Sequence, residues 1–223
     1  MPIQVVLFDL DDTVVNSRYA RYKAIVHTAA SLQRFGISAE EVRAHIEGHL
    51  AEHYTAVATG ALDLATYREK RFLGLAGRHP KVPASAWEDA NALYESSFYG
   101  AIRPLDGAKE TLEALQPRYH IGILTNGNRE MQERKLKEAG MALPMVASSD
   151  VQCCKWELLF FRRALERLGV EPGSAAYFSD SYEKDVVVAR TLLLAAHVEN
   201  ERHEHDGPCL LGIGEVPAFL AGR

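Results

Sequence analysis

The sequence predicts an α/β protein in which a doubly wound parallel sheet carries a helical insert. Short apolar runs rich in β-branched residues recur along the chain, and helical patterns separate them. Strands that alternate with helices in this way are typical of βαβ units and of a parallel sheet. The stretch 16–100 contains no strand-like run. We therefore predict a core of residues 1–15 and 101–223 and an α-helical insert of residues 16–100.

Five segments have the pattern of strands. The first, residues 3–8, is a short apolar run that stops at acidic residues, as expected of a strand covered on both faces. The other four predicted strands are residues 120–124, 144–147, 175–178 and 193–198.

Start and stop signals support the helices between these strands. Gly169 stands where an apolar helical pattern ends, which is typical of a C-terminal cap. Within the insert, Ser38 precedes Glu41 and Ser85 precedes Glu88 by three positions, which is the spacing of a capping box. We predict that a helix begins at each of these serines.

Composition excludes several classes of protein. The 223 residues include 25 Lys+Arg and 30 Asp+Glu, and this net charge of −5 gives no electrostatic reason to expect a nucleic acid polymer as partner. No apolar run approaches the roughly 20 residues of a membrane span, and residues 1–10 lack the basic start of a secretory signal. Three cysteines are too few for a disulfide framework. We therefore expect a cytoplasmic protein with no membrane partner.

Two carboxylates, Asp9 and Asp11, directly follow the first predicted strand. In open α/β sheets, ligands bind beyond the carboxyl ends of the strands. Carboxylates two positions apart on an extended segment point the same way, about 6–7 Å from each other. Such a pair suits Mg²⁺, which takes carboxylate, water and phosphate oxygens as ligands. The alternative is an acidic loop that caps the next helix.

Other polar residues follow later strands. Thr125 and Asn126 end the second predicted strand, and Asp180 follows the fourth, with Asp185 five positions later. Lys155 opens the predicted helix between these two strands. A hydroxyl group, a lysine and further carboxylates therefore occur, in this order, near successive strand ends.

With these residues the chain resembles the haloacid dehalogenase superfamily of phosphohydrolases over nearly its whole length. The residues that match its four motifs are Asp9, Asp11, Thr13, Thr125, Lys155, Asp180 and Asp185. The resemblance implies a Rossmann-like core, with residues 16–100 as a subclass I helical cap domain. Within the superfamily, the chain is most similar to the branch containing pyrimidine 5′-nucleotidases, through its Asp-Leu-Asp-Asp-Thr run, Thr125-Asn126-Gly127, Gln132 and Lys135-Leu136.

The resemblance implies a Mg²⁺-dependent phosphomonoester hydrolase that acts on a small phosphorylated metabolite, a nucleotide or a sugar phosphate. Asp9 is expected to be the nucleophile and to form an aspartyl-phosphate. Asp11 is expected to act as general acid and base, with a pKa raised by neighbouring carboxylates. Mg²⁺ is expected on the side chains of Asp9 and Asp180 and on the backbone carbonyl of Asp11.

The remaining motif residues have supporting roles by the same resemblance. Thr125, Asn126 and Lys155 are expected to bind the phosphoryl group, and Thr125 and Lys155 are also expected to take part in catalysis. Asp185 is expected to orient Lys155 or a metal-bound water from outside the site, and Thr13 to position the acidic loop.

A phosphomutase of the β-phosphoglucomutase type is an alternative, because such enzymes resemble this chain in all four motifs. Their caps normally carry a histidine or lysine that shuts out water. The insert of this chain contains four candidate histidines, His27, His45, His49 and His53.

A weakly active or non-catalytic phosphate-binding protein is the second alternative, because three positions depart from the family pattern. Trp156 stands where a proline usually follows the lysine, and Ser179 stands where a glycine usually precedes Asp180. Leu193 stands near a position where a glycine usually ends a helix, and a Cβ in a left-handed conformation there costs about 1 kcal/mol.

Two further clusters carry weaker signals. His197 and the run His203-Glu204-His205 could bind a metal, but we interpret them as part of a solvated loop. The adjacent Cys153 and Cys154 could form a redox pair, but we expect two small buried side chains.

Overall fold

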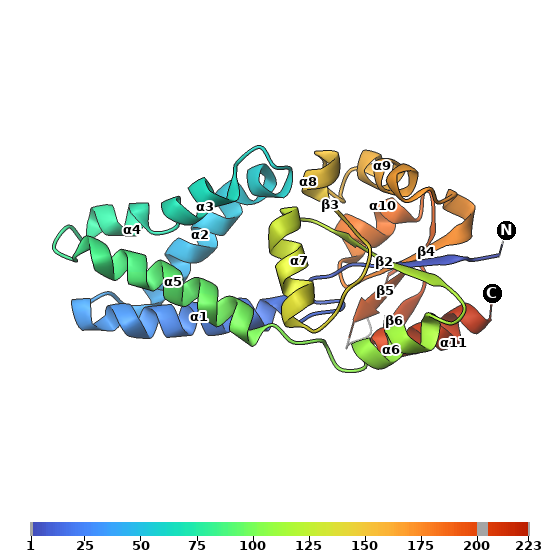
Figure 1. Ribbon diagram of the computed structural model, residues 1–223, viewed down its shortest axis with the longest axis horizontal. Helices are drawn as coiled ribbons and strands as arrows, with labels where there is room; N and C mark the ends of the chain where they lie inside the picture. The colour runs from blue at the N-terminus through green and yellow to red at the C-terminus, as the bar shows by residue number, and fades with distance from the viewer. Residues whose placement is uncertain (1, 200–204, 223) are drawn as a thin grey trace.

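The computed structural model describes residues 2–199 and 205–222, which form a six-stranded sheet with helices on both faces and a group of helices beyond one end (Figure 1). All strand pairs are parallel, in the order β3-β2-β1-β4-β5-β6. The chain moves outward from β1 in both directions, so the predicted doubly wound sheet is confirmed. The strands are β1 (Val5–Phe8), β2 (His120–Thr125), β3 (Met145–Ala147), β4 (Ala175–Ser179), β5 (Leu194–Glu199) and β6 (Cys209–Leu211).

Helices connect these strands. Those between β1 and β2 are α1 (Ser17–Leu32), α2 (Ala39–Ala58), α3 (Leu64–Lys70), α4 (Leu73–Arg78), α5 (Ala84–Ala101) and α6 (Ala108–Leu115). Those after β2 are α7 (Arg129–Glu138), α8 (Ser148–Val151), α9 (Leu158–Leu168), α10 (Val187–Ala189) and α11 (Val216–Ala221). Single turns of 3-10 or π-helix are η1 (Gln33–Phe35), η2 (Pro172–Ser174), η3 (Tyr182–Val186) and η4 (Ile213–Glu215).

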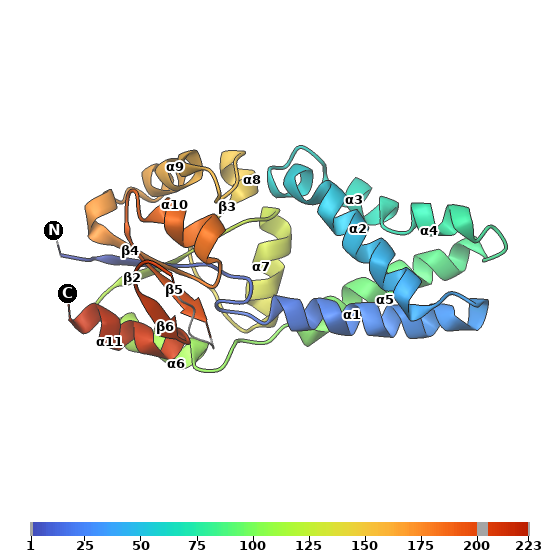
Figure 2. The ribbon, with the colours of Figure 1, turned by 180° about the vertical axis from the view of Figure 1, so that it is seen from behind.

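The sheet is buried on both faces because successive side chains of each strand point to opposite sides. Phe8 packs in the cluster that contains residues of α6 and α11, whereas Leu7 packs with Phe160 and Phe161 of α9. Figure 2 shows α6 and α11 on one face and α9 and α10 on the other. Each fully buried phenylalanine stabilises the fold by about 1.5–3 kcal/mol, so these two layers hold β1 rigidly.

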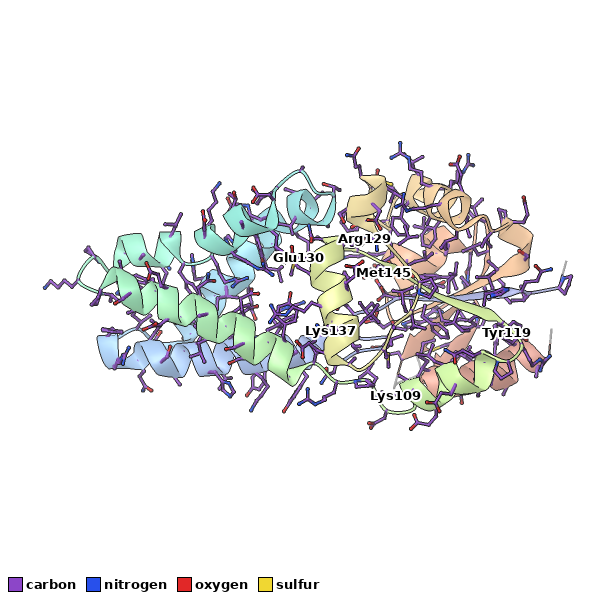
Figure 3. All side chains as sticks on the ribbon, in the orientation of Figure 1. Lys109, Tyr119, Arg129, Glu130, Lys137 and Met145 are labelled. Carbon is purple, nitrogen blue, oxygen red and sulfur yellow. The ribbon has the colours of Figure 1, made fainter. Side chains whose placement is uncertain are left out.

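Helices α1–α5 lie together beyond the carboxyl ends of the strands, and α7, which begins at Arg129 and Glu130, lies between them and the sheet (Figures 1 and 3). Residues 16–100 are all described and contain no strand, as predicted. Ser38 Oγ accepts a hydrogen bond from Glu41 N at 3.1 Å, so it caps α2 as predicted. The prediction for Ser85 was wrong, because α5 already begins at Ala84.

The five predicted strands are confirmed to within two residues at each end. Strand β6 was not predicted, because it has only three residues between Pro208 and Gly212. The strain considered at Leu193 is not found: within residues 2–199 and 205–222, the only non-glycine residues with positive φ are Asp12 and Gln152. No helix in these two ranges is both long and apolar enough to cross a membrane.

Candidate active site

The central strand places Asp9 at the carboxyl edge of the sheet. Asp9 directly follows β1, and its backbone N–H donates to the carbonyl of Phe178 in β4 at 2.8 Å. This bond continues the β1–β4 ladder by one residue, so the Asp9 backbone is fixed by the sheet. Its side chain is buried, with 7% of its surface exposed.

Lys155 joins two buried carboxylates. Its Nζ donates to Asp9 Oδ1, to Asp185 Oδ2 at 2.6 Å and to the hydroxyl of Tyr177 at 3.2 Å. Ser179 Oγ also donates to Asp185 Oδ2, at 2.8 Å. Burial opposes the positive charge of Lys155, but Asp185 and Asp9 outweigh it and raise the pKa of the ammonium group well above its usual value. Lys155 is therefore held as a cation.

The same cluster holds more negative charge than Lys155 neutralises. Burial is the largest effect on the pKa of Asp9 and raises it well above its usual value. The attraction of Lys155 lowers this pKa, but repulsion from Asp185, Asp180 and Asp11 raises it again. Burial is also the main cause that raises the pKa of Asp180, to about 6. Asp9 and Asp180 therefore lack enough nearby positive charge to balance their own negative charge.

Asp180 is fixed to the acidic loop by Thr13. The Thr13 hydroxyl accepts a hydrogen bond from Asp180 N at 2.9 Å and donates to Asp180 Oδ1 at 3.3 Å. Next to Thr13 in the acidic loop, Asp12 adopts a left-handed conformation with φ 62°, which costs an aspartate about 1 kcal/mol. This turn is closed by a hydrogen bond from Asp12 N to Val15 O at 2.7 Å, and it brings the two loops together.

Asp11 has an environment that the sequence did not indicate. Its carboxylate accepts from Lys135 Nζ at 2.6 Å, from Gln132 Nε2 at 2.9 Å and from the hydroxyl of Ser17. Burial acts to raise the pKa of Asp11, but the Lys135 charge and these hydrogen bonds lower it to about 2. The expectation of a raised pKa was therefore wrong for this arrangement, because the neighbouring cation comes from α7, distant in sequence.

Thr125 and Asn126 lie at the end of β2 beside the same cluster. The Thr125 hydroxyl accepts from Gln132 Nε2 at 2.6 Å. The Asn126 side-chain oxygen accepts from the backbone N–H of Lys155 at 2.9 Å. Asn126 thus holds the turn that carries Lys155, a positioning contact beyond the substrate binding expected for it.

The departures from the family pattern leave the cluster intact. Lys155 does not open a helix as expected, since α9 begins three residues later at Leu158. Trp156 therefore occupies a turn, where its ring lies 6.0 Å from that of Tyr54 in α2. The hydroxyl of Ser179 binds Asp185 as described above and accepts from Ser181 N at 3.1 Å. At this position the serine adds two hydrogen bonds.

The structure brings the candidate residues of the sequence to one edge of the sheet: Asp9, Asp11, Thr13, Thr125, Asn126, Lys155, Asp180 and Asp185. Sequence reasoning missed Ser17 and Tyr177, and it noted Gln132 and Lys135 for their resemblance to one branch of the superfamily without giving them a role in the site. Gln132 and Lys135 lie three positions apart, so they share one face of α7. That polar face was the available signal for their common partner Asp11.

Two hollows flank the acidic loop. The one beneath the insert is lined by Asp11, Gln132 and Lys135 from the sheet side and by aromatic residues of the insert, Tyr54, Tyr67, Tyr94, Phe98 and Tyr99. The other is lined by Asp12, Thr13, Arg18 and Asp180. The Asp11 carboxylate therefore faces an aromatic chamber.

The histidines of the insert lie elsewhere. His45 contacts the carbonyl of Arg71 at 2.8 Å, His49 contacts the carbonyl of Tyr67 at 3.1 Å, and neither they nor His27 and His53 are among the described lining residues of the two hollows. The water-excluding histidine considered for a phosphomutase is thus not found over the carboxylates in the described parts of the chain.

The remaining clusters gave mixed outcomes. Cys153 and Cys154 are buried free thiols, as expected. His197 lies buried within β5, so its interpretation as part of a solvated loop was wrong. His205 is half-buried, and His203 and Glu204 lie outside the described residues.

Known proteins resemble this chain over most of its length. A glyceraldehyde 3-phosphate phosphatase from Methanopyrus kandleri is 28% identical over 192 residues, covering 82% of this chain and 78% of that protein. A validoxylamine A 7′-phosphate phosphatase from Streptomyces hygroscopicus subsp. limoneus is 26% identical over 188 residues, covering 80% of this chain and 77% of that protein.

Solved structures share the fold. A 2-haloacid dehalogenase from Pseudomonas syringae superposes with a TM-score of 0.74 at 20% identity, with 99% of each chain covered. The sequence model of the haloacid dehalogenase-like hydrolases matches residues 3–192. Since this match spans most of the chain, the chain belongs to the haloacid dehalogenase-like hydrolase family.

Proposed function

We propose that the chain is a Mg²⁺-dependent phosphomonoester hydrolase that acts on a small phosphorylated metabolite, a nucleotide or a sugar phosphate, through an aspartyl-phosphate on Asp9. The observation that carries this proposal is the buried Asp9 carboxylate on the central strand, held by Lys155 and flanked by Asp11 and Asp180. Both curated relatives reported above are named as phosphatases of small phosphorylated molecules, which supports the choice of ester.

Mg²⁺ fits the residues present. Carboxylate and carbonyl oxygens are its preferred protein ligands, and the raised pKa values of Asp9 and Asp180 reflect negative charge that a divalent cation would offset. The side chains of Asp9 and Asp180 and the backbone carbonyl of Asp11 would hold it. When bound, Mg²⁺ supplies positive charge that allows a phosphate dianion to approach a carboxylate.

Asp9 is the nucleophile in this proposal. A carboxylate oxygen forms a bond to phosphorus while the bond from phosphorus to the alcohol oxygen breaks, and water then displaces the phosphoryl group from Asp9. Lys155 fixes the direction of the carboxylate through its hydrogen bond, and Asp185 in turn fixes Lys155. This alignment lowers the entropic cost of in-line attack.

Asp11 moves the proton. Lys135 lines the aromatic chamber together with Asp11, so a phosphate that enters competes for the Lys135 ammonium. Once that ion pair is weakened, burial raises the pKa of Asp11, so Asp11 takes up a proton from solvent before the ester bond breaks. It then donates this proton to the departing alkoxide. The resulting carboxylate takes a proton from the attacking water in the second step.

Thr125 contributes to phosphoryl binding. Its oxygen already accepts from Gln132, and its own proton points to the carbonyl of Asn126 at a long 3.4 Å. A charged phosphoryl oxygen accepts a shorter and stronger hydrogen bond than a neutral carbonyl does. The Thr125 hydroxyl would therefore turn from the Asn126 carbonyl to the phosphoryl group when substrate binds.

We further propose that residues 16–100 act as a cap that holds the leaving group. Arg71 is buried, donates to Glu95 at 2.6 Å, and places its guanidinium 4.4 Å from the ring centre of Tyr94. Aromatic faces and this Arg71–Glu95 pair line the chamber, groups that can stack on and hydrogen-bond to a sugar or base. The chamber encloses only about 90 Å³, so in this proposal the cap moves away from the sheet to admit the leaving group.

The test is phosphate release from p-nitrophenyl phosphate by the wild type and by Asp9→Asn, in Mg²⁺ and in EDTA. Asp89→Asn, the same change on the exposed surface of α5, is the matched control. We expect release that needs both Mg²⁺ and Asp9 and is unaffected by Asp89→Asn. Release of chloride from 2-chloropropionate without phosphate release, or phosphate transfer within a sugar phosphate in its place, would overturn the proposal.

A further inference from the structure

We propose that His197, His205 and Cys209 form a Zn²⁺ site distinct from the carboxylate cluster. One ligand atom from each residue lies within 4.8 Å of the other two. His197 Nδ1 is 2.8 Å from His205 Nε2 and 3.8 Å from Cys209 Sγ. Two imidazole nitrogens and one thiol sulfur thus face one another at the edge of the sheet.

The sheet brings His197 and Cys209 together. His197 in β5 is the register partner of Cys209 in β6, and of Ser179 in β4 on its other side. Register partners on adjacent parallel strands lie about 4.8 Å apart and point to the same face. The spacing of these two side chains is therefore set by backbone hydrogen bonds.

The tautomer of His197 places its lone pair on the nitrogen that faces His205 and Cys209. Its Nε2 lies 2.9 Å from the carbonyl of Asp180 and 3.2 Å from a carboxylate oxygen of Glu199. Both oxygens can only accept a hydrogen bond, so Nε2 carries the proton and the lone pair is on Nδ1, facing His205 and Cys209. A metal-bound histidine usually donates its other ring N–H to a carbonyl or carboxylate in this way.

His205 is held against the ring of Tyr182, with ring centres 3.7 Å apart and 12° between the planes. The Tyr182 hydroxyl donates to the carbonyl of Asp206 at 2.7 Å, and Arg190 donates to the same oxygen. His205 Nδ1 is buried with no hydrogen-bond partner in the described structure. The ring is thus positioned by stacking and by the anchored Asp206, with its Nε2 directed to His197.

The donor set favours Zn²⁺ over Mg²⁺. Nitrogen and sulfur suit Zn²⁺, whereas Mg²⁺ takes oxygen ligands. Bonds of about 2.0–2.1 Å to nitrogen and about 2.3 Å to sulfur place tetrahedral ligand atoms roughly 3.3–3.6 Å apart. The two separations from His197 Nδ1 differ from these values by about 0.5 Å or less, and the separation between His205 and Cys209 is within 4.8 Å, so binding requires it to shorten by at most about 1.2 Å. Water completes the fourth position of such a site.

This site would stabilise the turn that carries Asp180. A cation on Nδ1 makes the Nε2–H group of His197 a stronger donor, and its partner is the carbonyl of Asp180. Zn²⁺ would thus link β5, β6 and the loop after β4.

The test uses the reduced full-length protein, stripped with EDTA, dialysed and then kept in excess Mg²⁺ to saturate the carboxylates. Co²⁺ is titrated first as a spectroscopic substitute, and Zn²⁺ is then added in competition. We expect one Co²⁺ per chain, a thiolate-to-cobalt charge-transfer band, tetrahedral visible absorption, and displacement by Zn²⁺. Cys209→Ser should abolish the band and weaken Zn²⁺ binding by at least about 100-fold.

Three further variants complete the experiment. His205→Ala should also weaken Zn²⁺ binding and independently tests the site if Cys209→Ser folds poorly. Cys153→Ala, which removes a different thiol, and Asp9→Asn, which changes the carboxylate cluster, should both keep the band. Absence of the band in the wild type, its persistence in Cys209→Ser, or its loss in Asp9→Asn would overturn the proposal, leaving His197 and His205 as a hydrogen-bonded pair only.

Discussion

Replacing Lys155 by methionine should destabilise the protein strongly, and more so as the pH rises. The Lys155 side chain is 4% exposed, and its ammonium group contacts Asp9, Asp185 and Tyr177, which are all buried. Removing one partner from a buried ion pair costs about 3–5 kcal/mol, because the remaining charge loses its compensation. For a chain of 223 residues this corresponds to a fall in Tm of roughly 6–20 °C.

The pH dependence follows from the same loss. The pKa of Asp9 already lies above its usual value because of burial, and loss of the Lys155 attraction raises it further. Asp9 in the variant therefore keeps its proton in the folded state at pH values where the wild type and the unfolded chain have released theirs. The folded state then binds more protons, so the free energy of unfolding falls with rising pH, by about 1.4 kcal/mol per pH unit for each retained proton. Relative to the wild type, the extra loss falls between the folded pKa of Asp9 in the wild type, which is already above its usual value, and its higher folded pKa in the variant.

The assay is thermal and urea unfolding in EDTA from pH 5 to pH 8, with the wild type beside Lys155→Met. Lys137→Met on the exposed surface of α7 (Figure 3) is the matched control and should change stability by less than about 0.5 kcal/mol. The double variant Lys155→Met/Asp185→Asn should recover part of the loss, because one uncompensated carboxylate is gone. A cost for Lys155→Met below about 1 kcal/mol, or one that does not change with pH, would refute this reasoning.

Three further predictions concern single contacts. Lys135→Met should lower the free energy of unfolding in EDTA by about 1–2 kcal/mol above pH 4, reduced from the full pKa effect because Asp11 is 29% exposed. In the wild type the pKa of Asp11 is lowered to about 2, so the stabilisation that Lys135 provides is lost as the pH falls from about 4 to 2. The difference in free energy of unfolding between the wild type and Lys135→Met should therefore shrink over that range, and a constant difference would contradict this prediction. Ser179→Ala should cost about 1–3 kcal/mol in urea unfolding, since buried Asp185 loses a donor, and Ser179→Ala as stable as wild type would count against that contact. Ser38→Ala should cost about 1 kcal/mol by the same assay through loss of the α2 cap, and equal helicity and stability would show the cap to be dispensable.

The sequence predicted the fold from local patterns, and it succeeded where those patterns were long enough. Residues 3–8 stop at Asp9, and the strand in the structure ends at Phe8. Strand β6 has three residues and no period to detect, so only its pairing with β5 defines it. The sequence predicted that α5 begins at Ser85. In the structure Pro83 is the residue before the first turn, so the helix already begins at Ala84.

The candidate site divides in the same way. Asp9, Asp180 and Thr125 could be located because each directly ends or follows a strand. The pKa of Asp11 could not be predicted, since its sign is decided by Lys135, which is 124 positions away and reaches Asp11 only after α7 packs against the loop. Tyr177 was missed because a tyrosine within an apolar strand gives no sign of a polar partner.

The central claim, that Asp9 carries the phosphoryl group, is tested most directly by trapping the intermediate. Asp11→Asn is mixed with p-nitrophenyl phosphate and Mg²⁺, quenched in acid within one turnover, digested and analysed by mass spectrometry. Loss of the base at position 11 should slow hydrolysis of the aspartyl-phosphate, so we expect a phosphoryl group on Asp9 in Asp11→Asn and none in Asp9→Asn. Phosphate release by the wild type with no phosphoryl group on Asp9 under any quench time, or with the group on another residue, would contradict the account.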